Sequence, residues 1–223
     1  MKLVTYPDRD LMMFALADQL ASDLNMALRL NKRASLSVPG GTTPGPVFDI
    51  LSGVPLDWAR VTVIPNDERW VPEDHPRSNA RLIRSRLLTG LAAAAHFVPL
   101  YADAPEPEAA MDRIAAAVSE HLPLSVLLAG MGADMHTASL FPGADRLAEA
   151  LAPGAPLVMP MRANAAGEPR VTLTARALAG AMAIHVVIAG DDKRAALELA
   201  ESLPPEHAPI KAILANATVH WAA

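Results

Sequence analysis

Two near-continuous apolar runs constrain the fold of this chain most strongly. They are SVLLAG at 125–130 and IHVVIAG at 184–190. Apolar runs that lack polar alternation are typical of strands buried on both faces of a sheet. Such a sheet needs helices on both sides, so the two runs predict an α/β protein.

Strand-like and helix-like segments alternate along the rest of the chain. Further strands are predicted at 3–6, 34–38 and 60–65, and helices at 8–30, from Pro44 onward, at 78–88, near 106–119 and at 192–202. Clusters of proline and glycine at 142–156 and 203–209 are expected to be loops. This order predicts a doubly wound, mostly parallel, Rossmann-like sheet with helices on both faces, in a single domain covering 1–223. Ligands of such sheets bind beyond the carboxyl ends of the strands.

The composition argues against several classes of protein. A formal net charge of −5 is unfavourable for a nucleic-acid partner. The chain has no cysteine, which excludes disulfides, thiolate catalysis and cysteine-ligated zinc. Asp8, Asp10 and Asp18 interrupt the first apolar stretch, so a signal peptide is not expected, and no apolar run is long enough to span a bilayer. We therefore expect a cytoplasmic protein that binds neither nucleic acids nor membranes.

Glycines and hydroxyls follow the predicted strand at 34–38. Gly40, Gly41, Thr42 and Thr43 lead into Pro44, which suits the first turn of a helix. Converging backbone N–H groups and a helix N-terminus attract an anion such as phosphate. No Gly-Lys-Ser/Thr follows, so a nucleotide P-loop is excluded. An ordinary turn with a helix cap is the alternative.

Three consecutive ionisable residues, Asp67, Glu68 and Arg69, follow the predicted strand at 60–65. A carboxylate beside a guanidinium can fix the geometry of charge in a cleft. A surface cluster of ion pairs is the alternative, and composition alone favours it. The polar residues that come next are expected to form mostly a solvated face: Arg77, Asn79, Arg81 and Arg84.

The glycine-rich segment after 125–130 contains Asp134 and His136. A histidine on a loop at a strand end is suited to general acid–base catalysis, and a nearby carboxylate can orient its ring. Met135 occupies the third glycine position that a dinucleotide fingerprint requires, so we expect no such cofactor. No second histidine lies at metal-ligand spacing, so we expect no metal either.

Cations late in the chain complete the candidate set. They are Arg162, Arg170 and Lys193, and Lys193 follows the predicted strand at 184–190, where a cation could reach the mouth shared with the other loops. A solvent-facing lysine is the alternative for Lys193. A phosphate nest, a carboxylate, a histidine and a cation on four strand-end loops together predict a small phosphorylated substrate.

These motifs resemble the signature of the glucosamine/galactosamine-6-phosphate isomerase and 6-phosphogluconolactonase family, and of its 6-phosphogluconolactonases in particular. The matching segments are GGTTP at 40–44, DERWVP at 67–72 with His75-Pro76 and Ser78-Asn79, GMGADMHTASLFPG at 130–143, PRVTLT at 169–174, and Gly190 with Lys193. They occur in the family's order over most of the chain. The resemblance implies a doubly wound fold and hydrolysis of a phosphosugar lactone, without a cofactor or metal, by a monomer or small homo-oligomer.

The resemblance also implies roles for individual residues. His136 would act as the base on water and then as the acid toward the ring oxygen, with Asp134 supporting it. Asp67 and Arg69 would line the reaction site. The phosphate would be held by Gly40, Gly41, Thr42, Thr43, Arg170 and Lys193.

The sequence departs from the family pattern at three positions. Met135 stands where the family usually has glycine, so a positive φ there would strain the backbone. Thr42 replaces the more usual serine and keeps the hydroxyl. Arg77 stands where an acid is common.

Two other functions remain alternatives. An amino-sugar phosphate deaminase–isomerase on the same scaffold would continue past the histidine toward an Asn-Glu pair, but here Thr137-Ala138 follow, with no acid before Asp145. A non-catalytic sugar-phosphate sensor would need a DNA-binding appendage, which an acidic chain with an integrated α/β pattern does not suggest.

Overall fold

A computed structural model of the chain describes residues 1–164 and 166–223. All strand pairs of its main sheet are parallel. In spatial order, the strands that these residues place in the main sheet are β1 (Lys2–Thr5), β10 (Ala217–Ala222), β9 (Ala183–Ala189), β6 (Val126–Gly130), β2 (Ala34–Val38), β3 (Val61–Pro65) and β5 (His96–Phe97). The predicted doubly wound parallel sheet is confirmed. Strands β10 and β5 were not predicted from the sequence.

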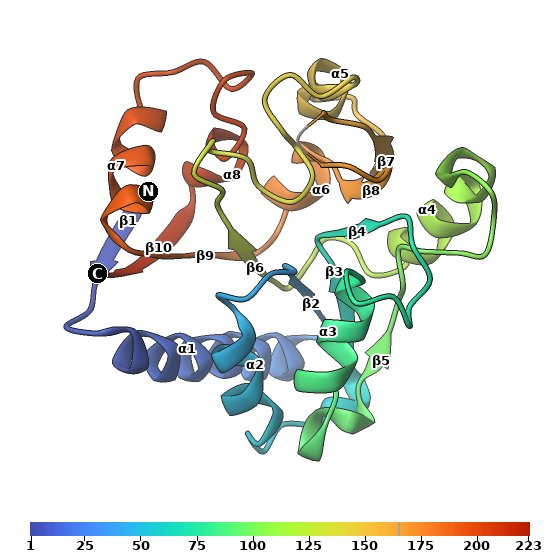
Figure 1. The fold of residues 1–223 in the computed structure, drawn as a ribbon. Helices are drawn as coiled ribbons and strands as arrows, with labels where there is room; N and C mark the ends of the chain where they lie inside the picture. Colours follow the sequence, from blue (N-terminus) through green and yellow to red (C-terminus); the bar gives the residue numbers. More distant parts are fainter. Residues whose placement is uncertain (165) are drawn as a thin grey trace.

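Helices cover both faces of this sheet (Figure 1). The α-helices are α1 (Arg9–Leu30), α2 (Gly45–Ser52), α3 (Asn79–Arg86), α4 (Met111–Ser119), α5 (Leu147–Leu151), α6 (Ala175–Ala179), α7 (Asp191–Ala200) and α8 (Lys211–Leu214). Short 3₁₀ turns are η1 (Trp58–Arg60), η2 (Gly90–Ala94) and η3 (Pro107–Ala110). Helices α1, α2 and α3 pack on one face, and α6, α7 and α8 on the other. The prediction of a loop over 142–156 is wrong at Leu147–Leu151, where α5 forms. The prediction of a loop over 203–209 is confirmed, because this segment contains no helix or strand.

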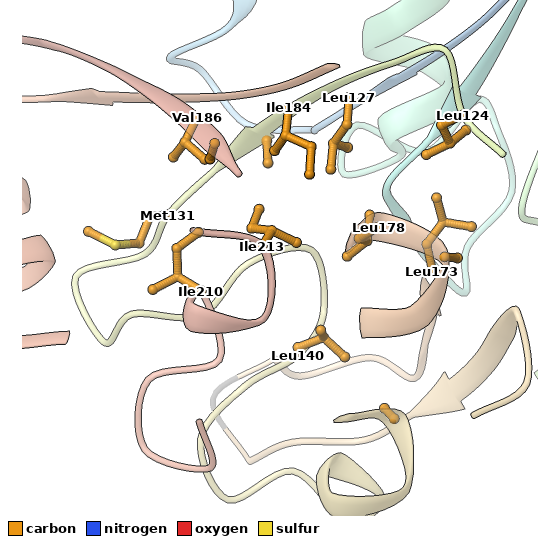
Figure 2. Close-up of a cluster of buried hydrophobic side chains, with 14 of the residues drawn as sticks. Leu124, Leu127, Met131, Leu140, Leu173, Leu178, Ile184, Val186, Ile210 and Ile213 are labelled. Atoms are coloured by element: carbon orange, nitrogen blue, oxygen red, sulfur yellow. The ribbon is translucent and has the colours of Figure 1, made fainter. Parts of the chain in front are cut away.

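The side chains of the central strand β6 divide between two hydrophobic clusters. Val126 and Leu128 face the α1 side, whereas Leu127 and Ala129 face the other side. Figure 2 shows Leu127 on its strand across from Leu178 and Ile213. Because both faces are buried, each fully buried Leu or Val contributes about 1.5–3 kcal/mol of transfer free energy. This explains why the strand reads as a continuous apolar run.

Helix α1 begins at a clear capping residue. The side chain of Asp8 accepts a hydrogen bond of 2.8 Å from the N–H of Leu11. Met12, Leu16 and Leu20 recur every four residues and are fully buried, so one stripe of the helix packs on the sheet. Among the described residues, no helix combines the length and hydropathy needed to cross a membrane.

A second, smaller sheet is antiparallel and was not predicted. It consists of β4 (Asp67–Arg69), β8 (Arg170–Leu173) and β7 (Val158–Met161), in that order. The register pairs Arg69 with Arg170 and Asp67 with Thr172. This small sheet therefore brings together residues that lie a hundred positions apart in the chain.

A row of polar side chains with two buried histidines at its centre lies between α1 and strands β9 and β10 of the main sheet. Asp23 Oδ2 lies 2.8 Å from His185 Nε2, and His185 Nδ1 lies 3.1 Å from His220 Nε2. The hydroxyl of Tyr6 lies 2.8 Å from His220 Nδ1. With both imidazoles neutral, Tyr6 donates to His220, His220 to His185, and His185 to Asp23. Each of the four ring nitrogens of His185 and His220 then has a hydrogen-bond partner.

We predict that this chain of hydrogen bonds makes folding stability depend on pH. Burial, with the nearby charges of His185 and Lys2, lowers the pKa of His220 from 6.5 to about 4. The folded protein therefore binds this proton less readily than the unfolded chain, so the stabilisation is complete above pH 6.5 and is lost as the pH falls through 4. The expected loss between pH 7 and pH 4 is about 3 kcal/mol.

Urea denaturation of the wild type and of His220→Gln at both pH values measures this contribution. The variant is expected to lose less stability on acidification than the wild type. His96→Gln, which changes an exposed histidine, is the control and should behave like the wild type. Equal losses in the wild type and His220→Gln would contradict the assignment.

Candidate functional site

A cavity of about 410 Å³ opens where the strand order of the main sheet reverses. From β2 the chain builds outward through β3 to β5, and from β6 it builds in the opposite direction through β9 to β10. Segments that follow β2, β3, β6 and β9 line the cavity, together with the start of β8. This is the switch point at which doubly wound sheets bind ligands.

All of the predicted site residues except Asp134 line this cavity. They are Gly40, Gly41, Thr42, Thr43, Asp67, Arg69, His136, Arg170 and Lys193. Asp134 lies behind His136 and contacts its ring. Arg162, the other late arginine considered, lies elsewhere and forms ion pairs with Glu106 and Glu108.

Asn66 holds the sheet together at this switch point and is fully buried. Its side-chain oxygen accepts a hydrogen bond of 2.6 Å from Ser37 Oγ on β2, and its amide donates over 2.8 Å to the carbonyl of Leu128 on β6. These bonds tie the carboxyl ends of β2 and β6 to the residue after β3. Hydrogen bonds of Asn66 therefore hold together the strand ends that border the cavity.

His136 is oriented by the carboxylate two residues before it. Its Nδ1 lies 2.5 Å from Asp134 Oδ1, which leaves Nε2 as the nitrogen free for a reacting group. Burial disfavours the charged form of Asp134, but the hydrogen bond and charge of His136 outweigh burial, so the pKa of Asp134 lies below its usual value. Gly132 is required beside this pair, because a Cβ there would overlap with the imidazole. The geometry suits a neutral histidine that accepts a proton at Nε2.

The loop that carries His136 stores backbone strain. Met135 has φ 65° and Ala138 has φ 49°, both in the left-handed region. Such a conformation costs a residue with a side chain about 1–2 kcal/mol. Met135 thus adopts the positive φ that the sequence analysis describes as strained for a residue with a side chain. The backbone N–H of Ile210 donates to the carbonyl of Met135 over 3.0 Å, which helps to hold the loop in this shape.

Asp67 is buried in a network of hydrogen bonds at the cavity wall. Ser139 Oγ donates to Asp67 Oδ2 over 2.5 Å, and Arg170 Nη1 lies 3.6 Å from the same oxygen. Asn79 Nδ2 donates to Asp67 Oδ1 over 3.2 Å. Because Asp67 is only 6% exposed, the surface ion-pair interpretation is wrong for it.

Glu68 points away from the cavity and caps helix α3. Its carboxylate accepts hydrogen bonds of 2.7 Å from each of the N–H groups of Asn79 and Ala80, and one of 2.9 Å from that of Arg69. Burial raises the pKa of Glu68 although these backbone donors oppose the shift. The surface interpretation is wrong for this residue too, since it is fully buried. Glu68 holds the helix start in place.

Asn79 is a site residue that the sequence analysis placed on a solvated face. It is buried, it lines the cavity, and its side chain fills the space beside Gly40, where a Cβ would overlap with it. The signal that could have found it is Ser78, whose hydroxyl caps α3 and so fixes Asn79 at the first turn. The expectation of a solvated face holds for Arg81 and Arg84, which are exposed.

The arginines of the small sheet each have a buried N–H group without a protein partner. Arg69 donates from Nη1 to the carbonyl of Arg77 over 2.5 Å, and Arg170 donates from Nη2 to that of Ala166 over 3.0 Å. Among the residues that the structure describes, the Nε atoms of Arg69 and Arg170 have no hydrogen-bond partner. Burial lowers the pKa of Arg170, and the charge of Asp67 opposes this shift. Buried unpaired donors favour an anionic ligand.

Lys193 and the glycine loop form the opposite part of the cavity. Lys193 Nζ donates to the carbonyl of Met131 over 2.6 Å, and burial lowers its pKa. Gly41 has φ 89°, a conformation that few other residues adopt, while Thr42 and Thr43 are exposed at the cavity mouth. Within 1–164 and 166–223, no three His, Asp or Glu side chains are grouped so as to hold a metal ion.

The fold and the site define a doubly wound α/β protein with a polar, cation-lined ligand cavity at its switch point. The family described as glucosamine-6-phosphate isomerases/6-phosphogluconolactonase matches residues 7–221. The chain belongs to this family.

Individual relatives are similar over nearly their whole length. A 6-phosphogluconolactonase from Mesorhizobium japonicum is 46% identical over 225 residues, which cover 97% of this chain and 93% of the relative. One from Rhizobium meliloti is 45% identical, with 93% of each chain covered. The crystal structure of a 6-phosphogluconolactonase from Shewanella baltica is 32% identical, covers 100% of this chain and 98% of its own, and superposes with a TM-score of 0.96.

Proposed function

We propose that this chain hydrolyses 6-phospho-D-glucono-1,5-lactone to 6-phospho-D-gluconate, a step of the oxidative pentose phosphate pathway. The observation that carries the proposal is a histidine held by a carboxylate in a cavity lined by Arg69, Arg170 and Lys193. The similarity to 6-phosphogluconolactonases over nearly the whole chain supports the same substrate.

In the proposed mechanism His136 first acts as a base. Its Nε2 takes a proton from water while the water oxygen bonds to the lactone carbonyl carbon. Asp134 stabilises the protonated ring through Nδ1. When the tetrahedral intermediate collapses, the bond from the carbonyl carbon to the ring oxygen breaks, and His136 returns the proton to that oxygen. The new carboxylic acid then ionises, so each turnover releases one proton.

Asp67 and Arg69 belong to the reaction site in this proposal. Asp67 positions Arg170 by the buried ion pair, and Arg69 presents a second guanidinium to the same cavity. Cations near the carbonyl would stabilise the negative charge that develops on its oxygen. Asp67 is the only carboxylate among the described residues that line the cavity. None of the described residues after His136 that line the cavity is an acid, whereas a deaminase is expected to have an Asn-Glu pair past the histidine.

The direct test follows proton release from freshly prepared lactone at near-neutral pH, with the spontaneous rate subtracted. Turnover well above that background supports the proposal. Ammonia release from glucosamine 6-phosphate would instead identify a deaminase. Tight binding of both compounds with no turnover of either would identify a sensor.

The phosphate is proposed to bind to the glycine loop with Arg170 and Lys193. We predict that Lys193→Ala lowers kcat/KM for the phosphorylated lactone by about 10- to 100-fold, since a hydrogen bond to a charged group is worth about 1.5–3 kcal/mol. Hydrolysis of the unphosphorylated lactone should change little. Lys211→Ala is the matched control, because Lys211 donates to backbone carbonyls outside the cavity. A similar loss with both substrates would argue against contact between Lys193 and the phosphate.

A further inference from the structure

Phe141 lies against the imidazole of His136. The two ring centroids are 4.3 Å apart and the ring planes are inclined by 35°. The guanidinium carbon of Arg170 lies 5.7 Å from the centroid of the same phenyl ring. Phe141 also lines the cavity, yet it is only 8% exposed. One aromatic side chain thus contacts the proposed base and lies close to a buried cation of the site.

The position of Phe141 is set by its own loop. Leu140 N donates to the carbonyl of Thr137 over 3.0 Å, and Ala144 N donates to the carbonyl of Phe141 over 3.0 Å. Leu140 is fully buried in the hydrophobic cluster that Figure 2 shows. The core therefore fixes the phenyl ring, and the phenyl ring limits where the imidazole can turn.

We propose that Phe141 is a positioning residue for His136, an inference that rests on the proposed lactone hydrolysis. The phenyl ring and Asp134 together fix the imidazole so that Nε2 serves the reacting water. The electron-rich face of the phenyl ring also attracts the positive charge that the imidazole acquires during the reaction. Phe141 on one side of the ring and Asp134 at Nδ1 thus both stabilise the protonated imidazole.

The pH dependence of the proposed reaction also reflects the charged groups that surround His136. Asp134 binds the imidazole directly, and the remaining charged groups that line the cavity are Asp67, Arg69, Arg170 and Lys193. Replacing Phe141 by an uncharged residue leaves all of these charges in place, although Arg170 also lies 5.7 Å from the phenyl ring. A change in pH dependence therefore reports on the aromatic contacts of Phe141 with His136 and Arg170.

The test compares Phe141→Met and Phe141→Leu with the wild type and with Phe97→Leu. Phe97 is a matched control, since the guanidinium of Arg84 lies 4.6 Å from its ring and it lies outside the cavity. Methionine fills a similar volume without an aromatic face, so this variant should fold even if Phe141→Leu does not. Both Phe141 variants are expected to lower kcat about tenfold, with KM nearly unchanged. Phe141→Tyr should restore most of kcat, and Phe97→Leu should leave kcat unchanged.

The pH profile separates positioning from a merely structural role. The acidic limb of kcat is expected to move down by about one pH unit in Phe141→Met, because the protonated imidazole loses its aromatic contact. Unchanged kcat and an unchanged acidic limb in Phe141→Met would overturn the proposal. If the wild type does not hydrolyse the lactone, the proposed function fails, and NMR titration of the His136 ring in both proteins still tests the contact. The same titration midpoint in both proteins would then overturn it.

Discussion

Replacing His136 with alanine is expected to lower kcat for the phosphorylated lactone by about 10²–10⁴-fold, the usual contribution of a general acid–base group. Both proton transfers of the proposed mechanism use this imidazole, so its loss removes both. Because the side chain is 30% exposed and lies on a loop, the fold should persist. The measurement is proton release above the spontaneous background, with unfolding followed in parallel.

The control for this experiment is His207→Ala, which removes an exposed histidine from the segment before α8. It should retain full activity. Near-normal hydrolysis by His136→Ala would show that the proposed mechanism is wrong, even if the lactone is still the substrate. If His136→Ala lost activity and also had a lowered free energy of unfolding, while His207→Ala had neither defect, His136 would have a structural role instead.

Replacing Glu68 with alanine is expected to lower the free energy of unfolding by about 3 kcal/mol or more. Two buried backbone N–H groups and one half-buried N–H group would lose their acceptor, and each unsatisfied buried donor costs about 1–3 kcal/mol. The start of α3 would then loosen, and with it Asn79, which reaches both Asp67 and the glycine loop. Urea denaturation measures the loss of stability.

Glu198→Ala is the matched control for Glu68. Glu198 is exposed and pairs with Arg194 one turn earlier on α7, and such surface pairs contribute at most about 1 kcal/mol. Glu68→Gln keeps one oxygen as an acceptor and should fall between the two. If Glu68→Ala cost no more than Glu198→Ala, the capping role would be refuted.

The main sheet was largely predictable because its central strands are buried on both faces. For β6 and β9, near-continuous apolar sequence identified the strands to within one or two residues, and β2 was predicted with the bounds that the structure gives it. Strand β10 escaped detection because it mixes Thr218, His220 and Trp221 with small apolar residues. The buried His220 is satisfied by hydrogen bonds to His185 and Tyr6, which come from distant parts of the chain. Local sequence contains no sign of such partners.

The candidate site was predictable as a set of loops, but its internal arrangement was not. The rule that ligands bind at the carboxyl ends of parallel strands brought the four loops together correctly. Adjacent residues Asp67 and Glu68 nevertheless face opposite sides of β4, one toward the cavity and the other toward α3. Three residues are too few for a strand to reveal its alternation in sequence. Their separate functions therefore depend on tertiary structure.

The position of β10 between β1 and β9 has a consequence for synthesis of the chain. Lys2 pairs in register with Thr218, and within residues 1–164 and 166–223 β10 is the only strand that pairs with β1, so β1 has no partner strand until β10 has been synthesised. Until then β9 presents an unpaired edge, the kind of edge that invites aggregation in a nascent polypeptide. Strand β1 is therefore synthesised before the other strands of the main sheet but can pair only after β10 has been made.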